Sequence, residues 1–259
     1  MHARDISTPF GRPGFLVLAG SRLFGIDTAE SDYDYAGALV EPEAYRIGLK
    51  NYSQGKNHQH GFEQHEFNGD NYEGTVYGLW KLASMFAEGN PTILTLLFAD
   101  PIRDDYGICT PEFRKIVVSA RSGHRFMKYM EAQRKSMIGE RAQHVKRLEL
   151  IDAYGYDTKF AGHLIRLGYQ GIEFLYQGTI TLPMPEYQRG NVLAIRAGKW
   201  TMDEVVQASL DLQAEMEAAM VVTDLQPEAD WEALNDWVVG KYNTFWVREK
   251  QKVLDFRAG

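Results

Sequence analysis

Two aspartates stand one residue apart, Asp32 and Asp34, with tyrosines at positions 33 and 35. Residues two apart in a β-strand point to the same face, so a strand here would project both carboxylates together and both tyrosines to the other face. Adjacent carboxylates repel one another unless a cation lies between them. Their hard oxygen ligands suit Mg²⁺, which often joins one or two carboxylates to substrate phosphates. The alternative interpretation is an exposed turn that begins at Ser31.

A glycine–serine pair, Gly20-Ser21, comes shortly before these aspartates and directly after the apolar run 15–19. This order is typical of a buried strand that enters a turn. Backbone N–H groups at such a turn, together with the Ser21 hydroxyl, can donate to a phosphate, and Arg22 would add positive charge. A phosphate cradle close to a carboxylate pair predicts a site for a metal-bound phosphate.

The elements that must position these residues are predicted to be two strands and a helix. The first strand covers 15–19, and the second covers 31–40, where polar and apolar residues alternate before Pro42. Residues 51–70 are polar and predict a loop or an exposed hairpin. Apolar positions at helical spacing predict a helix from Tyr77, which Gly89-Asn90-Pro91 should end.

The second half of the chain is predicted to be mostly helical. Helices are expected at about 112–149, 157–177, 201–220 and 228–255, with a hinge at 181–186. Residues 99–112 are predicted to form a loop at a domain boundary. The predicted fold class is α/β (α+β), with a small head at 1–105 that holds a short mixed sheet. A helical domain is predicted at 106–259.

Composition excludes several other classes of protein. The chain has 259 residues, of which 44% are hydrophobic and 24% charged, and these fractions are typical of globular proteins rather than disordered ones. No apolar stretch approaches the roughly 20 residues that a membrane span needs. The N-terminus lacks the pattern of a secretory signal, and Cys109 is the single cysteine. We therefore expect a soluble, cytoplasmic protein without a membrane partner.

The two motifs together resemble a known signature. Leu18-Ala-Gly-Ser-Arg-Leu-Phe-Gly followed by Ser31-Asp-Tyr-Asp-Tyr is similar to the glycine–serine and paired-acid motifs of the DNA polymerase β-like nucleotidyltransferase superfamily. Further segments resemble a branch of predicted nucleotidyltransferases that is associated with RNA repair and is also found in phages. These are Tyr77, Leu79 and Lys81, then 89–92, 96–98, 156–167 and 182–185.

The resemblance implies a site with named roles. Asp32 and Asp34 would hold two Mg²⁺ ions, with Mn²⁺ as a substitute, about 4 Å apart. Gly20 and Ser21 would hold the β- and γ-phosphates of a nucleoside triphosphate such as ATP. A third carboxylate from a neighbouring strand would complete the metal site and help to deprotonate the acceptor hydroxyl. The candidates are Glu66, Asp70 and Glu73, and the spacing to Tyr77 and Lys81 favours Glu73.

A helical face further along the chain is a second candidate for nucleotide binding. Lys159, His163 and Arg166 lie at i, i+4 and i+7, so a helix would present them together. That face could contact the triphosphate or the base from the helical domain. The alternative is a solvated stripe with Asp157 and Glu173 nearby.

Two other clusters have weaker functional interpretations. His58, His60 and His65 lie near Glu63 and Glu66, but their spacing matches no standard zinc pattern, so an exposed loop is favoured over a transition-metal site. Residues 125–147 hold seven basic and two acidic residues, a local charge of +5 in a chain of net charge −7. This segment could follow a polyphosphate backbone, although most charge runs are solvated helix faces.

We therefore expect an enzyme that transfers an NMP from an NTP to an acceptor hydroxyl and releases pyrophosphate. The branch suggests an RNA 3′ end, or tRNA, as the acceptor. Two other hypotheses remain. One is a nucleotide-binding regulatory module without turnover. The other is a toxin-like nucleotidyltransferase that modifies a protein, a tRNA or a small molecule such as an aminoglycoside.

Overall fold

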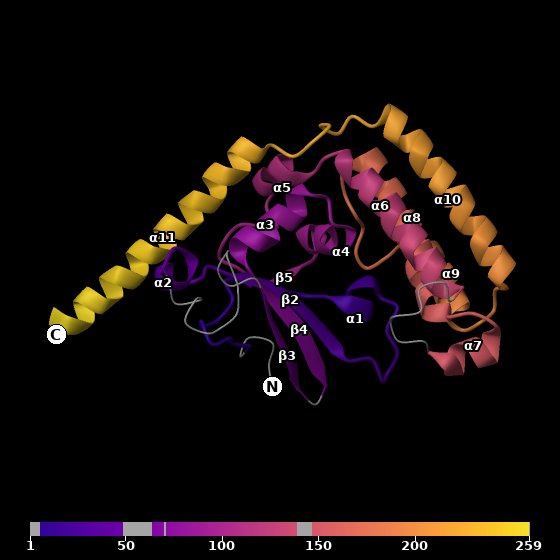
Figure 1. Ribbon diagram of the computed structural model, residues 1–259, viewed down its shortest axis with the longest axis horizontal. Coiled ribbons are helices and arrows are strands. Elements are labelled where there is room, and N and C mark those ends of the chain that lie inside the picture. The colour runs from indigo at the N-terminus through magenta and orange to yellow at the C-terminus, as the bar shows by residue number, and fades with distance from the viewer. Residues whose placement is uncertain (1–5, 49–63, 70, 139–146, 259) are drawn as a thin grey trace.

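The computed structural model describes residues 6–48, 64–69, 71–138 and 147–258, and within them one five-stranded mixed sheet. The strand order is β3-β4-β2-β1-β5 (Figure 1). β2 and β4 pair in parallel, and the other neighbours pair antiparallel. The strands are β1 (Phe15–Leu18), β2 (Tyr33–Leu39), β3 (Gln64–Gly69), β4 (Tyr72–Gly78) and β5 (Pro101–Asp104). The predicted fold class, an α/β head followed by a mostly helical remainder, is confirmed.

The strand pattern explains why β1 lies inside the sheet. Phe15 and Val17 are fully buried on one face, and Leu16 is buried on the other, so a short apolar run covers both faces. The edge strand β5 falls within 99–112, where a loop was predicted, and that prediction was wrong for Pro101–Asp104. Proline has no N–H to donate, so it is tolerated at the start of an edge strand.

Short helices connect and cover the sheet. α1 (Gly20–Phe24) joins β1 to β2, and α2 (Glu43–Arg46) follows β2. α3 (Leu79–Ala87) directly follows β4, as its apolar spacing predicts, and ends before Gly89, whose φ is +73°. Asn90 then caps α4 (Pro91–Leu94), and the 3₁₀ helix η3 (Thr95–Phe98) follows it. Of the polar segment 51–70, residues 64–69 form β3, while 51–63 and 70 lie outside the described residues.

Helices make up the rest of the described chain, but not as one run over 112–149. That segment contains α5 (Pro111–Val117), α6 (Arg121–Met137) and the start of α7 (Leu148–Tyr154). The break after α5 is held by Gln226, whose side-chain amide donates to the carbonyls of Lys115, Ile116 and Val118. The remaining helices are α8 (Thr158–Gln177), α9 (Glu186–Arg196), α10 (Met202–Val222) and α11 (Trp231–Ala258).

The helices form two groups around the sheet (Figure 1). α6, α8, α9 and α10 lie together on the side of α1, while α11 runs along α3 and α5 toward α2. One buried cluster of apolar side chains extends from Phe15 through Phe126 to Leu234. The division at 105/106 stays a prediction. Within the described ranges, no helix is both long enough and apolar enough to cross a membrane.

Candidate active site

The turn after β1 brings the backbone of Gly20 against Asp34. The Ala19 N–H donates to the Asp34 carbonyl at 2.8 Å, which fixes the end of β1 beside β2. Gly20 has a φ of +61°, a left-handed conformation that favours glycine. A Cβ at this position would lie 1.6 Å from Asp34 Oδ2. Glycine is therefore required here both for its backbone conformation and for its contact with the carboxylate.

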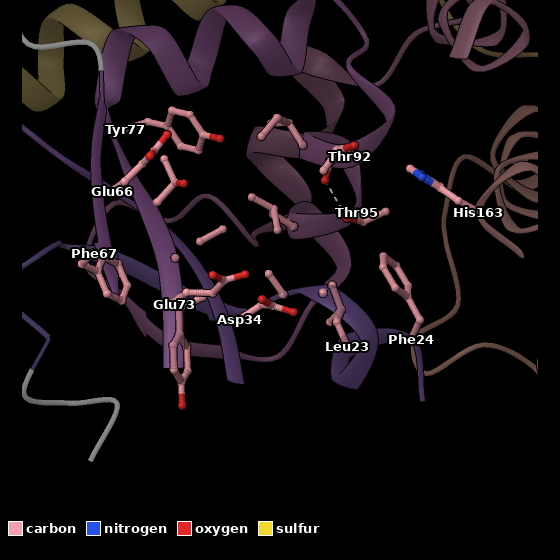
Figure 2. A pocket seen from close by; sticks show the side chains of 18 of the residues that line it. Leu23, Phe24, Asp34, Glu66, Phe67, Glu73, Tyr77, Thr92, Thr95 and His163 are labelled. Atoms are coloured by element: carbon pink, nitrogen blue, oxygen red, sulfur yellow. Dashed lines mark hydrogen bonds between the residues drawn. The ribbon is translucent and has the colours of Figure 1, made fainter. Parts of the chain in front are cut away.

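The parallel pairing of β2 with β4 places Glu73 beside Asp34. These two residues are Cα partners, and their side chains are neighbours in Figure 2. Burial, then the charge of Asp34 and a hydrogen bond with it, and finally the charge of Asp32 raise the pKa of Glu73. Asp32 lies directly before β2. Three of the predicted carboxylates thus interact where the neighbouring strands β2 and β4 begin.

The grouping of the carboxylates is looser than a preformed metal centre. Among the residues that the structure describes, no three His, Cys, Asp or Glu side chains are close enough together to hold an ion. Glu66, on β3, is the partner of Thr75 and not of Asp34. Asp70 lies outside the described residues, as do His58, His60 and Glu63, so those predictions have no structural outcome.

Two cavities open on these carboxylates. The sheet-side cavity has a volume of about 620 Å³ and is lined by residues of β3, β4, α4 and η3, including Glu66, Tyr77 and Thr92 (Figure 2). The helix-side cavity has a volume of about 580 Å³ and is lined by Thr28, Ser31 and residues of α8 and α9. Six residues line both cavities: Gly20, Phe24, Asp34, Glu73, His163 and Arg166.

The two other residues predicted for the phosphate cradle differ in their surroundings. Ser21 lines the helix-side cavity, together with Asp32. Arg22 lines neither of the two cavities. Its guanidinium donates to the carbonyls of Asp32 and Ser31, at 3.2 and 2.5 Å, and forms an ion pair with Asp27 at 3.0 Å. Arg22 therefore holds the loop that carries Asp32, and its nucleotide-binding role stays a prediction.

Helix α8 brings its predicted face to the cavities. The Asp157 side chain caps the helix by accepting from the N–H groups of Lys159 and Phe160. Lys159 is exposed and lines the helix-side cavity. His163 points into the sheet-side cavity from the side opposite Asp34 (Figure 2). Burial, and then the charge of Arg166, lower the pKa of His163 to about 3, so its imidazole is neutral near pH 7.

The sequence pattern did not predict one residue that lines the helix-side cavity. Arg196 ends α9, lines the helix-side cavity and donates to the Ile26 carbonyl at 2.5 Å. No helix was predicted between the hinge and residue 201, so nothing placed Arg196 near the site. The spacing of Val192 and Ile195, both fully buried, is the signal that could have indicated this helix.

The described residues of the basic segment 125–147 lie on α6 and at Arg147, and none of them lines either cavity. Arg125 pairs with Glu88 at 3.3 Å, and Lys135 pairs with Glu131 at 2.5 Å. Arg147 forms an ion pair with Asp157 at 3.0 Å. Much of the described positive charge is thus balanced locally, and a contact with a polyphosphate backbone stays a prediction.

Comparison with known proteins gives one family. A family model described as RlaP, RNA repair pathway DNA polymerase beta family, matches residues 14–240. The match includes the Gly20 turn, the three interacting carboxylates and the face of α8. No curated protein matches the chain.

Proposed function

Because the chain belongs to the RNA repair pathway DNA polymerase beta family, we propose that it transfers an NMP from an NTP to an acceptor hydroxyl. The family confirms the suspected likeness to polymerase β-like nucleotidyltransferases and supports an enzyme of that broad class. What we propose beyond membership of the family is the reaction, the cation and the acceptor. One observation supports it most. Asp34 and Glu73 are paired across β2 and β4 where two cavities meet.

The donor chemistry of the carboxylates fits a divalent cation. Burial, and then the charges of Asp34 and Asp32, raise the pKa of Glu73, and a cation among these groups would relieve the repulsion between the charges. Mg²⁺ is commonly bound by one or two carboxylates together with substrate phosphates, so a complete cluster of protein ligands is not needed beforehand. Asp32, Asp34 and Glu73 would hold it, with Mn²⁺ as a substitute. When bound, the cation would polarise the phosphoryl oxygens and lower the pKa of the acceptor hydroxyl.

The chain's own residues would bind and orient the substrates. The Gly20 backbone and the Ser21 hydroxyl would donate to phosphate oxygens, and the ammonium of Lys159 would attract the triphosphate from the helix-side cavity. His163, neutral near pH 7, offers one donor and one acceptor to the nucleotide. The acceptor oxygen forms a bond to the α-phosphorus, and its proton passes to a carboxylate of the site, for which Glu73 beside Asp34 is the candidate. The bond from the α-phosphorus to the bridging oxygen breaks, and pyrophosphate leaves with that electron pair.

An RNA 3′ hydroxyl is the proposed acceptor, and the family description supports it. A cytoplasmic location fits such a substrate and belongs to the same proposal. The decisive experiment incubates the protein with each α-labelled NTP, with Mg²⁺ or Mn²⁺, and with RNA or whole-cell protein extract. Asp34→Asn is compared with Asp211→Asn, a control in α10 on the exposed surface.

The outcomes separate the hypotheses. Label on RNA that Asp34→Asn abolishes and Asp211→Asn retains supports the proposal. Label on protein would instead favour a toxin-like enzyme. Nucleotide binding without any transfer would favour a regulatory module and contradict the proposed activity.

A further inference from the structure

Arg166 is a buried cation at the centre of the site. Its side chain is held on both sides, because Nη1 donates to Gln170 Oε1 at 2.7 Å and the guanidinium carbon lies 3.9 Å from the centre of the Phe24 ring. The residue is only 7% exposed. Burial lowers the pKa of Arg166 to about 9, so the guanidinium still carries its charge near pH 7.

This charge has no anionic partner in the part of the chain that the structure describes. None of the ion pairs found there includes Arg166. Burying an unpaired charge is costly, and buried arginines are normally paired with carboxylates. The neighbouring side chains that hold Arg166, an amide and an aromatic ring, cannot neutralise it. The arrangement therefore fits a guanidinium whose anion comes with a ligand.

The location of Arg166 indicates which ligand. It lines both cavities, as do Gly20, Asp34 and Glu73. No ion pair of the described residues joins Arg166 to Asp34 or Glu73. A ligand that fills the space between Arg166 and the carboxylates must carry negative charge on the side that faces α8. A phosphate at the junction of the two cavities meets that condition, and a planar guanidinium can bind two of its oxygens at once.

We propose that Arg166 binds a phosphate of the incoming nucleotide, at the junction of the two cavities next to the reacting phosphorus. This inference rests on the proposed function, because it takes the nucleotide as the ligand. Gln170 and Phe24 hold the guanidinium in place before the phosphate arrives. His163 lies one turn earlier on α8, and its buried Nε2 has no hydrogen-bond partner in the described chain, so it is free to contact the same ligand.

A ligand-binding role and a structural role predict opposite effects of Arg166→Met. Methionine fills similar space without a charge, and replacing a poorly compensated buried charge by an apolar group is often neutral or stabilising. Met also removes the donor to buried Gln170, and that loss offsets the gain from removing the charge, so the melting temperature should change little. Affinity for the nucleotide should fall roughly 10- to 100-fold, the usual effect of losing a charge-assisted hydrogen bond. Arg166→Lys keeps a cation and should bind with intermediate affinity.

Arg114 provides a matched control. Its guanidinium lies 4.9 Å from the Phe98 ring and donates to the Leu97 carbonyl at 3.0 Å, but it lines neither cavity. Arg114→Met should lower the melting temperature and leave nucleotide affinity unchanged.

The experiment measures melting temperature and calorimetric affinity for the full chain and these variants. The probes are α,β-methylene ATP with Mg²⁺ and inorganic tripolyphosphate with Mg²⁺. Weaker binding of both probes by Arg166→Met, with a smaller fall in melting temperature than Arg114→Met shows, supports the inference. Equal affinity in the wild type and Arg166→Met, or a fall in the melting temperature of Arg166→Met at least as large as that of Arg114→Met, overturns it. If the wild type binds neither probe, the proposed function fails together with the inference.

Discussion

The contact between Gly20 and Asp34 gives the most direct test of the site's geometry. Gly20→Ala forces alanine into a left-handed conformation at φ +61°, which costs about 1–2 kcal/mol for an L-residue. The added Cβ would also lie 1.6 Å from Asp34 Oδ2, well inside the contact distances that real Cβ atoms keep. The carboxylate must therefore move by more than 1 Å, because real Cβ atoms essentially never have a contact under 3.0 Å and this one would be at 1.6 Å. A misplacement of about 1 Å in an active site can reduce the rate about 100-fold.

Gly155→Ala separates the backbone strain from the contact. Gly155 has a φ of +82°, and a Cβ built there meets nothing within 4 Å. Both variants should lose about 1–2 kcal/mol of unfolding free energy. Gly20→Ala should lose more than Gly155→Ala and should lose most of its nucleotidyl transfer. Urea unfolding and incorporation of α-labelled nucleotide measure the two effects.

A double variant tests whether the contact with Asp34 causes the additional loss of stability in Gly20→Ala. Replacing Asp34 by glycine in the Gly20→Ala background removes the carboxylate that the new Cβ meets, so part of the lost stability should return. Activity should stay low because Asp34 is absent. If Gly20→Ala matches Gly155→Ala in both stability and activity, the proposed contact between the turn and Asp34 is wrong.

Two other predictions concern single side chains. Ser21→Ala should weaken NTP binding by about 1–3 kcal/mol, the usual value of one charge-assisted hydrogen bond, and an unchanged calorimetric dissociation constant would remove Ser21 from the site. Glu41 is fully buried, and burial raises its pKa above the ordinary 4.5 despite the hydrogen bond from Tyr242. The folded protein then binds this proton more tightly than the unfolded chain, so its contribution to stability is complete below about pH 4.5 and is lost as the pH rises through the folded-state pKa. Glu41→Gln should therefore gain stability relative to the wild type as the pH rises, and a stability difference that is the same in urea unfolding at pH 4.5 and pH 8 would contradict this.

Local sequence patterns predict part of the fold around the site. The apolar run before Gly20 and the alternation after Ser31 both predict strands, and β1 and β2 confirm them. The helix after β4 is likewise readable from its apolar spacing. Strand alternation predicts Asp32 and Asp34 on one face, but β2 begins at Tyr33, so the shared face of Asp32 stays a prediction. These signals are local, because each depends only on the residues of its own segment.

Pairings between distant segments explain what the sequence could not show. The register that sets Glu73 beside Asp34 depends on a parallel contact between β2 and β4, and no local pattern determines it. The break after α5 depends on Gln226, which is more than 100 residues away, as its separation of 108 from Val118 shows. A break of this kind is invisible to helical periodicity in 112–149. The short strand β5 is equally non-local, since Pro101 is a strand residue only because β1 offers it an edge.

The charges of the site explain why the nucleotide and its cation should bind together. The sheet presents the neighbouring carboxylates of Asp34 and Glu73, while α8 presents the uncompensated cation Arg166. A divalent cation alone would relieve the carboxylates and leave Arg166 without an anion. A triphosphate alone would satisfy Arg166 but would be repelled by Asp34 and Glu73. Only a nucleotide bound with its cation matches both walls of the cavities, so each should raise the affinity of the other by the same factor.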